Sequence, residues 1–363
     1  MQYGEASKGR GTGANPHNRF HPQRSESDPA ELAAWSEVHD EAYQKHPQTE
    51  YIQQSCQSIV SKNNSPDIPF TYSINPYQGC EHGCVYCYAR PSHEYLDLSL
   101  GLDFETKIYC KTNAAEKLRV FLDQRNYRCE TIAIGGNTDP YQPSERQLKI
   151  TRSLLNVMVD TKHPVTLITK SNLILRDIDL LRELAFQNLV KVMISVTTMD
   201  VKLKNILEPR AASPKARLKA IETLRREGIP VGVMVAPVIP GINDPEIEDI
   251  VTQCANAGAL NAGYILLRLP HQLKELYESW LQQHYPLRKE KALNLLRECR
   301  NGELYQSDFR TRQSGVGHFA RLIEQRFSIA AKRNGLNLRR DSALRTDLFT
   351  PPGTSKQIDL FSL

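Results

Sequence analysis

Between residues 70 and 268, short apolar segments alternate with longer amphipathic ones, and no other feature of the sequence restricts the fold as much. The apolar segments are rich in β-branched residues, as expected of strands buried on both faces. The predicted strands are residues 70–74, 131–134, 165–169, 191–196, 231–236 and 263–267, and a further run at 107–110 is expected to extend the first unit. Six strands separated by helices predict an α/β fold, a partial (β/α)6 TIM-type barrel with its chemistry on the loops after the strands.

Two helices in this region have clear start and stop signals. Ser213 and Pro214 supply an N-cap and an N1 proline before an amphipathic stretch, and Gly228 ends it. Asp244 begins a second helix in the same way, and Gly258 follows its last turn. Both helices therefore fit between predicted strands.

Three cysteines lie close together in the segment 79–90, GCEHGCVYCYAR. Eight cysteines in 363 residues are too sparse for a disulfide scaffold, so their spacing matters more than their number. Cys80, Cys84 and Cys87 form a C-x3-C-x2-C pattern, and Gly79 and Gly83 allow the loop to turn tightly. Thiolate ligation in a reduced compartment favours an iron–sulfur cluster or zinc.

The number of cysteines bears on which centre they bind. A [4Fe–4S] cluster normally takes four cysteines, and no fourth one follows nearby, so one iron would stay open to another ligand. Two other interpretations are a zinc site completed by His82 or His93 and three unrelated thiols.

The spacing, the aromatic residue Tyr86 before the third cysteine, and the position after the first strand together resemble the radical S-adenosylmethionine superfamily. The resemblance implies a [4Fe–4S] cluster held by Cys80, Cys84 and Cys87, whose open iron is chelated by the amino and carboxylate groups of S-adenosylmethionine. It implies that reduction of the cluster yields a 5′-deoxyadenosyl radical. It also implies an electron donor such as flavodoxin or ferredoxin.

The resemblance extends to segments after the later strands. A polar turn at 135–139 would contact the amino group of S-adenosylmethionine, and residues 236–244 would line the adenine. Ordinary structural roles stay open for each segment, including a helix N-cap turn, a surface lysine, core packing and a loop salt bridge. The cofactor-binding residues that the resemblance implies are Tyr86, Gly135, Gly136, Asn137, Thr138, Lys170, Ser195 and Arg210.

Within the superfamily, YSINPYQGCEHGCVYCYAR followed by TDPYQPSE resembles the spore photoproduct lyase and DNA repair photolyase-like branch, over roughly residues 70–290. That implies a lyase-like enzyme of DNA repair. Those lyases carry a hydrogen-donating cysteine at the end of the second strand, where residues 133–139 here contain none. Cys129 lies at the opposite end. Tyr141 is either a substitute relay or a packed aromatic, so no catalytic residue is assigned.

Charge is concentrated towards the C-terminus. The chain has a net charge of +5, yet residues 288–345 hold 14 Lys and Arg against 6 Asp and Glu, a local net of +8. Helices are predicted at 287–299 and 317–334. The predicted phosphate-binding face consists of Arg310, Arg312, Arg321, Arg326, Lys332 and Arg333. The alternative is a solvated amphipathic face.

The ends differ in composition from the barrel. We expect residues 1–66 to form a polar, mobile arm and a partly helical lead-in, 67–285 the barrel, 286–345 a basic helical extension and 346–363 a flexible tail. Gln357 to Phe361, QIDLF, resembles the motif that docks bacterial repair proteins on the sliding clamp, or it is a strand that closes the barrel. No secretory signal or membrane-spanning run is visible, so the cytoplasm is the expected location.

The main hypothesis is a radical enzyme that acts on nucleic acid. The same chemistry on RNA, a peptide or a small metabolite is a second hypothesis. A third is a non-catalytic iron–sulfur or zinc module that binds nucleic acid.

Overall fold

The computed structural model describes residues 9–20, 48–338 and 343–353, and its centre is a seven-stranded sheet of order β10-β9-β8-β7-β6-β3-β2. Strand β2 pairs with β3 in antiparallel fashion, and the other neighbours pair in parallel. The strands are β2 (Val60–Lys62), β3 (Tyr72–Ile74), β6 (Ile132–Ile134), β7 (Val165–Thr169), β8 (Val190–Ser195), β9 (Val231–Val238) and β10 (Asn261–Leu266). All six predicted parallel strands are confirmed. Strands β2 and β10 lie at opposite edges, so the barrel is partial.

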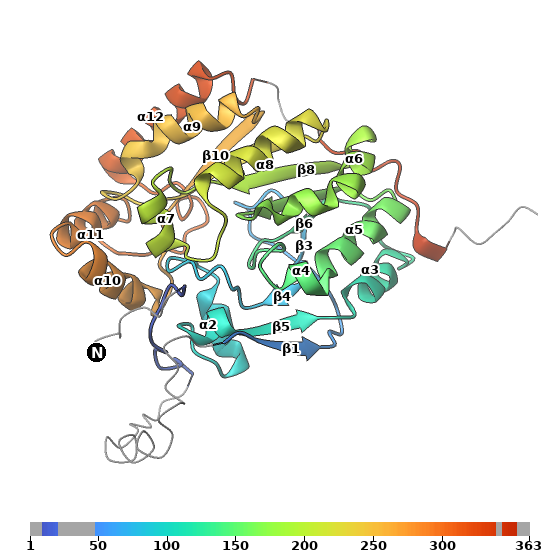
Figure 1. Cartoon of the computed structure of the whole chain (residues 1–363), viewed down its shortest axis with the longest axis horizontal. Coiled ribbons are helices and arrows are strands. Elements are labelled where there is room, and N and C mark those ends of the chain that lie inside the picture. Colours follow the sequence, from blue (N-terminus) through green and yellow to red (C-terminus); the bar gives the residue numbers. More distant parts are fainter. Residues whose placement is uncertain (1–8, 21–47, 339–342, 354–363) are drawn as a thin grey trace, which may run out of the picture.

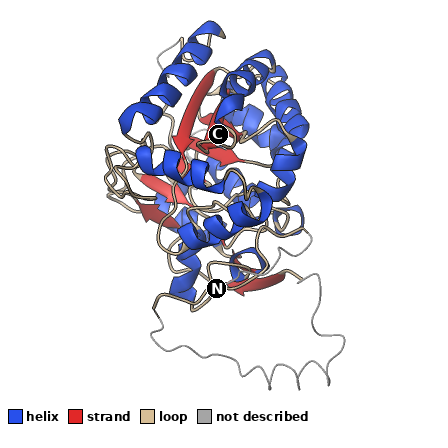
Figure 2. Ribbon diagram, turned by 90° about the vertical axis from the view of Figure 1, so that its left-hand side faces the viewer, coloured by secondary structure: helices blue, strands red, loops and turns tan. Residues whose placement is uncertain are grey.

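Helices cover the outside of this sheet, as Figures 1 and 2 show. Helix α3 lies against α5, α5 against α6, and α8 against α9, and α12 packs beside α9. The Phe327 ring of α12 also lies 4.9 Å from the Tyr264 ring of β10, which makes α12 part of the barrel wall. These outer helices are α3 (Ala114–Leu122), α5 (Ile150–Asp160), α6 (Ile178–Phe186), α8 (Pro214–Arg226), α9 (Ile247–Asn256) and α12 (Gly317–Arg333).

The predicted helix start at Ser213 is confirmed, and the one at Asp244 is displaced, since α9 begins three residues later and no side chain caps it. The Ser213 hydroxyl accepts a hydrogen bond from the Ala216 amide, 3.2 Å away, at the start of α8. Asp244 begins a 3-10 turn (Asp244–Glu246) that leads into α9. The C-terminal helices are α11 (Lys289–Glu298) and α12, as predicted, whereas α10 (Leu273–His284) was not anticipated. The shorter helices are α2 (Asp103–Thr106), α4 (Glu145–Leu148) and α7 (Val201–Leu207), with 3-10 helices at Arg90–Leu96 and Asn172–Asp177.

A second, three-stranded sheet of order β1-β5-β4 lies below the barrel in Figure 1. It consists of β1 (Glu50–Gln54), β5 (Lys107–Lys111) and β4 (Tyr77–Gln78). Part of the expected, partly helical lead-in lies outside the described residues; its described part, 48–66, holds no helix, because 50–54 form β1 and 60–62 form β2. The run at 107–110 is a strand, but it belongs to this second sheet and not to the barrel. Both errors have one cause, since the pairing of β1 with β5 joins residues far apart in the sequence.

The described parts of the two ends pack on the barrel, contrary to the expected mobility. At the N-terminal end, Arg10 is buried, and its guanidinium donates to the Glu105 carbonyl at 2.8 Å. At the C-terminal end, the Thr350 amide donates to the Thr161 carbonyl at 2.9 Å, and the Phe349 ring contacts His163. The clamp-like segment 357–361 lies outside the described residues.

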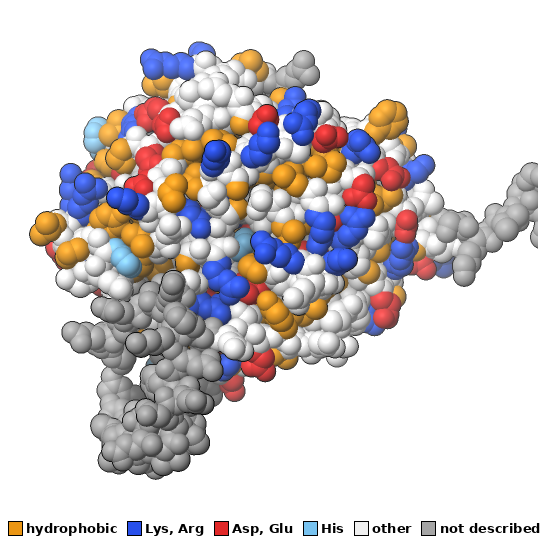
Figure 3. Space-filling view, in the orientation of Figure 1, with side chains coloured by type: hydrophobic (Ala, Val, Ile, Leu, Met, Phe, Trp, Pro, Cys, Tyr) orange, Lys and Arg blue, Asp and Glu red, His pale blue; other side chains and the backbone are white. Residues whose placement is uncertain are grey.

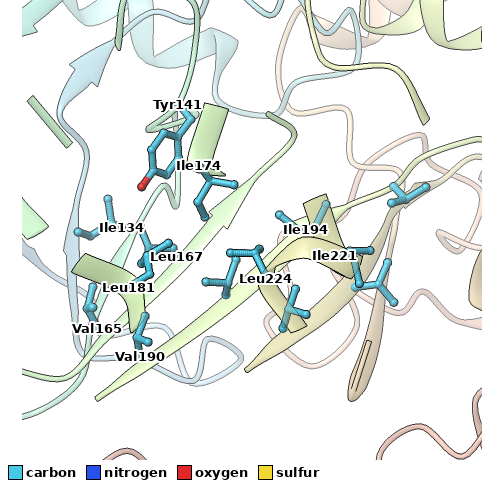
Figure 4. Packing of buried hydrophobic residues seen from close by; sticks show 14 of the residues in the cluster. Ile134, Tyr141, Val165, Leu167, Ile174, Leu181, Val190, Ile194, Ile221 and Leu224 are labelled. Atoms are coloured by element: carbon cyan, nitrogen blue, oxygen red, sulfur yellow. The ribbon is translucent and has the colours of Figure 1, made fainter. Parts of the chain in front are cut away.

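The core lies between the sheet and its helices, as Figure 4 shows. Ile134, Leu167 and Ile194 project from neighbouring strands, and Leu181 projects from α6. Burying each such side chain stabilises the fold by roughly 1.5–3 kcal/mol. Tyr141 belongs to this core and is 1% exposed, so it is a packed aromatic.

The predicted basic face at the C-terminus is partly neutralised. Arg326 donates to Glu248 at 2.6 and 2.7 Å, and Arg310 is paired with Asp308. Arg312 is paired with Asp67 at 2.6 Å. Figure 3 shows Asp and Glu side chains between the Lys and Arg side chains of the visible surface. Carboxylates thus offset three of the six charges of the predicted face, whereas Arg321, Lys332 and Arg333 are exposed on α12. Among the described residues, no helix is long and apolar enough to cross a membrane.

Candidate functional site

The cysteine loop follows β4 and is held in a tight turn at the carboxyl end of the first barrel strand. The Cys80 amide donates to the Phe104 carbonyl at 2.8 Å, and the Cys87 amide donates to the Cys84 carbonyl at 3.2 Å. Gly83 has φ +66°, and a Cβ there would lie 2.7 Å from a Glu105 carboxylate oxygen. Glycine is therefore required at this turn.

The three thiols of this loop are free and lie close enough to influence one another. Burial, with Asp139, Cys84 and Cys87 adding to it, raises the pKa of Cys80 well above its usual value. Burial and Glu208 raise the pKa of Cys84 to about 12, against the opposing charge of Lys170. A cationic centre reverses this effect, because metal binding deprotonates a thiol. Three neighbouring, largely buried thiols therefore fit the iron–sulfur cluster that the sequence predicted.

The histidines of the zinc alternative already have other partners. His82 Nδ1 lies 3.3 Å from Asp139 Oδ2, and His93 Nε2 lies 3.0 Å from the Lys107 carbonyl. In the part of the chain that the structure describes, no three His, Cys, Asp or Glu side chains are grouped as one metal ion requires. The arrangement thus gives no support to a zinc site.

Tyr86 is tied to a buried carboxylate that the sequence analysis did not single out. Its hydroxyl donates to Glu208, which also accepts from Thr197 at 2.6 Å and pairs with Arg217. Burial would raise the pKa of Glu208, but Arg217 and Lys170 outweigh it and hold that pKa at about 2. Glu208 is therefore ionised and joins the cysteine loop to the loops after β8.

The turn at 135–138 lies beside the cysteine loop. The Asn137 amide donates to Asn75 Oδ1 at 2.9 Å, and the Thr138 hydroxyl donates to the Tyr77 carbonyl at 2.9 Å. Gly135 has φ +98°, whereas a Cβ on Gly136 would meet nothing nearer than 3.9 Å. The backbone of Gly136 thus leaves open space for a ligand. The alternative, that this turn is the N-cap of the following helix, does not hold, because the N-cap residue of α4 is Ser144.

Asp139 connects this turn to β7. It accepts from the Thr169 hydroxyl at 2.6 Å and from the Lys170 amide at 2.7 Å. Burial opposes its ionisation, but His82 and these donors hold the pKa of Asp139 at about 2. Burial also tends to lower the pKa of Lys170, yet Cys84 and Glu208 raise it overall. Lys170 is therefore a protonated ammonium group beside Cys84.

Ser195 and Arg210 lie at different places. Ser195 ends β8, is buried, and accepts from Arg217 through its carbonyl at 3.0 Å. Arg210 lies 3.0 Å from the Glu81 carboxylate, which is the loop salt bridge left open as an alternative. Arg217, not Arg210, influences the pKa of both Cys84 and Lys170. No local signal marked Arg217, because it lies within an ordinary helix.

Two further loops complete the arrangement. In the predicted adenine loop, Asn243 donates to the carbonyls of Thr197 and Pro237 at 2.7 and 3.0 Å, which fixes its path. Tyr88 follows the third cysteine and donates to the Gly136 carbonyl. The guanidinium of Arg268, which follows β10, lies 5.1 Å from the Tyr88 ring centroid. The loops after all six parallel strands thus meet at one end of the barrel.

Comparison with known proteins agrees with this geometry. The family model of the radical SAM superfamily matches residues 74–254. An uncharacterised protein of Mycobacterium tuberculosis is 37% identical over 234 residues, 64% of this chain and 69% of that protein. One of Methanocaldococcus jannaschii is 26% identical over 215 residues, 59% and 76% of the two chains. A radical SAM Nα-GlyT isomerase of a Pseudomonas phage is 28% identical over 171 residues, 46% and 33% of the two chains.

Solved structures share the fold. Spore photoproduct lyase complexed with dinucleoside spore photoproduct superposes with a TM-score of 0.52 and 14% identity, covering 84% of this chain and 92% of that one. A mutant of it with bound AdoMet gives the same TM-score at 15% identity, covering 85% and 92%. The matching family model, the partial barrel and the cysteine loop agree: the chain belongs to the radical S-adenosylmethionine superfamily and uses a [4Fe–4S] cluster and S-adenosylmethionine.

Proposed function

We propose that this chain uses the radical chemistry of its superfamily on a nucleic acid, in a repair-like reaction at the mouth of the barrel. The observation that carries the proposal is an aromatic ring paired with a guanidinium group directly after the cysteine loop. The Arg268 guanidinium lies 5.1 Å from the centroid of the Tyr88 ring, and Tyr88 follows Cys87. Aromatic faces stack on unpaired bases, and guanidinium groups bind phosphates.

Cys80, Cys84 and Cys87 are the proposed ligands of the cluster. A bound and reduced cluster would supply the one electron needed to cleave the sulfonium of S-adenosylmethionine into methionine and a carbon radical. The proposed role of the protein's own residues is to bind and orient the cluster and S-adenosylmethionine. The remaining cysteines lie on other elements, near β2, in β5, before β6, in α9 and after α11, so they are not expected to take part; they are Cys56, Cys110, Cys129, Cys254 and Cys299.

Lys170 is the proposed partner of the methionyl carboxylate, because it is a protonated ammonium group beside Cys84. The turn at 135–138 is the proposed binding site of the amino group of S-adenosylmethionine, because the space beside Gly136 is open. Asp139 is a positioning residue for both contacts, since it ends this turn and accepts a hydrogen bond from the Lys170 amide. Tyr86 acts by holding the loop to Glu208.

Tyr88 is the proposed first contact for substrate. Tyr88 is 42% exposed, and its hydroxyl donates to the Gly136 carbonyl, so a substrate can reach it beside the turn at 135–138. Burial and Cys87 raise the pKa of Tyr88 against the charges of Arg268, Lys170 and Arg312, so cations gather around it. An anionic substrate is the natural complement of such a mouth.

The end of the second barrel strand favours a reaction other than that of the lyases it resembles. Residues 132–139 contain no cysteine, so no thiol of this strand can return a hydrogen atom to substrate. We therefore propose nucleic acid as the substrate class without a thymine-dimer product. A low-potential donor such as flavodoxin or ferredoxin is the proposed source of electrons.

The test is a deuterium-transfer assay. Reconstituted, reduced full-length protein is incubated with S-adenosylmethionine and with deuterated DNA or deuterated RNA. Deuterium in the released 5′-deoxyadenosine supports the proposal and identifies which nucleic acid is used. Release of 5′-deoxyadenosine without deuterium from either polymer would reject nucleic acid and direct attention to a peptide or metabolite.

A further inference from the structure

Residues 9–20, here named the strap, lie against the segment that supports the cysteine loop. The side chain of Asn15 and the backbone and carboxylate of Asp103 exchange hydrogen bonds of 2.9 and 3.1 Å. The Ser99 hydroxyl donates to the Pro16 carbonyl at 2.6 Å. These contacts join the strap to residues about 85 positions away, so its place is set by tertiary contacts.

A continuous chain of hydrogen bonds runs from the strap to the second cysteine. The Gly11 amide donates to Glu105 Oε2 at 2.8 Å. Glu105, fully buried, pairs through its other oxygen with Arg90. Arg90, also fully buried, donates through Nε to the Cys84 carbonyl at 2.9 Å. The backbone of Cys84 is thus positioned through two buried charges that the strap helps to satisfy.

A second chain runs to the first cysteine. Arg10 donates to the Glu105 carbonyl at 2.8 Å and to the Thr49 hydroxyl at 2.9 Å. Thr49 in turn lies 3.1 Å from the Glu81 carboxylate, directly after Cys80. The strap therefore reaches both halves of the cysteine loop through different side chains.

The packing between strap and loop leaves no spare room at Gly11. A Cβ on Gly11 would lie 1.8 Å from the carbonyl oxygen of Gly83, the residue before Cys84. A Cβ on Gly9, in the same segment, would meet nothing within 4 Å, so alanine there strains the backbone at φ +79° without touching the cysteine loop. Contact with the cysteine loop is therefore specific to one of the two glycines.

We propose that the strap is a positioning element of the cluster, which fixes the cysteine loop and covers its outer side so that the cluster is retained. The proposal rests on the proposed assignment of Cys80, Cys84 and Cys87 as ligands. Outer residues that orient metal ligands typically change metal affinity by about 10- to 100-fold when they are replaced. Loss of the strap contacts should therefore act on the cluster before it acts on the fold.

The experiment compares Gly11→Ala with Gly9→Ala in the reconstituted full-length protein under anaerobic conditions. Release of iron to a chelator is followed by the loss of the visible absorbance of the cluster. We expect release from Gly11→Ala to be about 10-fold faster than from the parent, or more, and release from Gly9→Ala to stay within about twofold. Equal rates for the two glycine variants would overturn the proposal.

A second variant keeps the proposal testable if Gly11→Ala does not fold. Arg10→Gln removes the guanidinium that joins Glu105 and Thr49 without adding bulk, and it should also accelerate iron release. Thermal unfolding of the metal-free proteins shows whether each variant folds, and the electron paramagnetic resonance spectrum of the reduced cluster should change in Arg10→Gln. Unchanged release and spectrum in a folded Arg10→Gln protein would reject the strap's role. Normal cluster content in Cys84→Ala would instead reject the ligand assignment.

Discussion

Arg312 donates two hydrogen bonds to the carboxylate of Asp67, at 2.6 and 2.7 Å. Asp67 lies between β2 and β3 at one edge of the sheet, and Arg312 precedes α12. The next residue, Gln313, accepts from the Leu266 amide of β10 at 2.8 Å and donates to the Asp67 carbonyl at 2.8 Å. This latch, Asp67 with Arg312 and Gln313, joins the first and last parallel strands across the side that the sheet leaves open.

Arg312→Gln should destabilise the protein by about 1 to 2 kcal/mol, the range for a charge-assisted pair near the surface. The pKa of Asp67 is lowered because the hydrogen bonds and charge of Arg312 and Gln313 outweigh its desolvation. A lowered carboxyl pKa stabilises the fold above about pH 4 and loses that effect as pH falls through the folded pKa. Urea unfolding at pH 7 and pH 3 measures this. Arg310→Gln, at an exposed site, is the control, and equal stability of the two variants at pH 7 would contradict the prediction.

The barrel could be predicted from the sequence because its signals are local. Each strand is a short β-branched run, and Ser213 and Asp244 mark helix starts within a few residues of where they occur. The second sheet could not be predicted, since β1 depends on the distant residues of β5 for its pairing. The ordered packing of the strap could not be predicted for the same reason. Its Gly- and Pro-rich composition indicates a mobile segment and gives no information about a distant partner such as Glu105.

The residues of the site also fall into those that a local sequence pattern locates and those that only the structure reveals. Cys80, Cys84 and Cys87 stand in one spaced motif, so the sequence alone located them. Glu208 and Arg217 were found by the structure, because a buried carboxylate and a helical arginine carry no pattern until the chain brings them beside Tyr86. Arg210 is the opposite case, because the resemblance implied that it binds the cofactor. In the structure its guanidinium forms an ion pair with Glu81.

Cys84→Ala should abolish reconstitution of the [4Fe–4S] cluster and the formation of 5′-deoxyadenosine. Removing one of three thiolates leaves a second iron without a protein ligand. Cys110→Ala is the matched control, because Cys110 is also buried but lies in β5. Iron and sulfide analysis after anaerobic reconstitution measures the effect, and four irons per chain in Cys84→Ala would contradict it.

Glu208→Gln should destabilise the protein by about 3 kcal/mol at pH 7, since it leaves the buried Arg217 without its counter-charge. The folded pKa of Glu208, about 2, lies below that of an unfolded glutamate. Its contribution is therefore complete above about pH 5 and declines as pH falls towards 2. The gap in unfolding free energy between parent and variant should narrow at pH 3. Glu183→Gln, exposed on α6, should have the same unfolding free energy as the parent at pH 7 and at pH 3. A difference between the parent and Glu208→Gln that does not change with pH would refute the ionised state of Glu208.

Lys170→Met should weaken binding of S-adenosylmethionine by about 10- to 100-fold, the loss of one charge-assisted contact to a carboxylate. Calorimetric titration of the reconstituted protein measures the dissociation constant. Lys202→Met, on the exposed side of α7, controls for the general loss of charge. Cluster content should be unchanged in both, because Lys170 is not a proposed ligand. An unaltered dissociation constant in Lys170→Met would assign the carboxylate to another cation, with Arg217 the first to test.

Arg268→Gln should weaken binding of a short single-stranded oligonucleotide and reduce the slope of log affinity against log salt by about 1. The reason is that Arg268 lies over Tyr88 at the mouth of the barrel, where a phosphate would follow a base stacked on that ring. Fluorescence anisotropy over a series of salt concentrations gives both quantities. Arg226→Gln, on the exposed end of α8 away from that mouth, should leave the slope as it is. If the two variants lose affinity equally, the binding is a diffuse effect of the positive net charge, and the mouth of the barrel is not the nucleic-acid site.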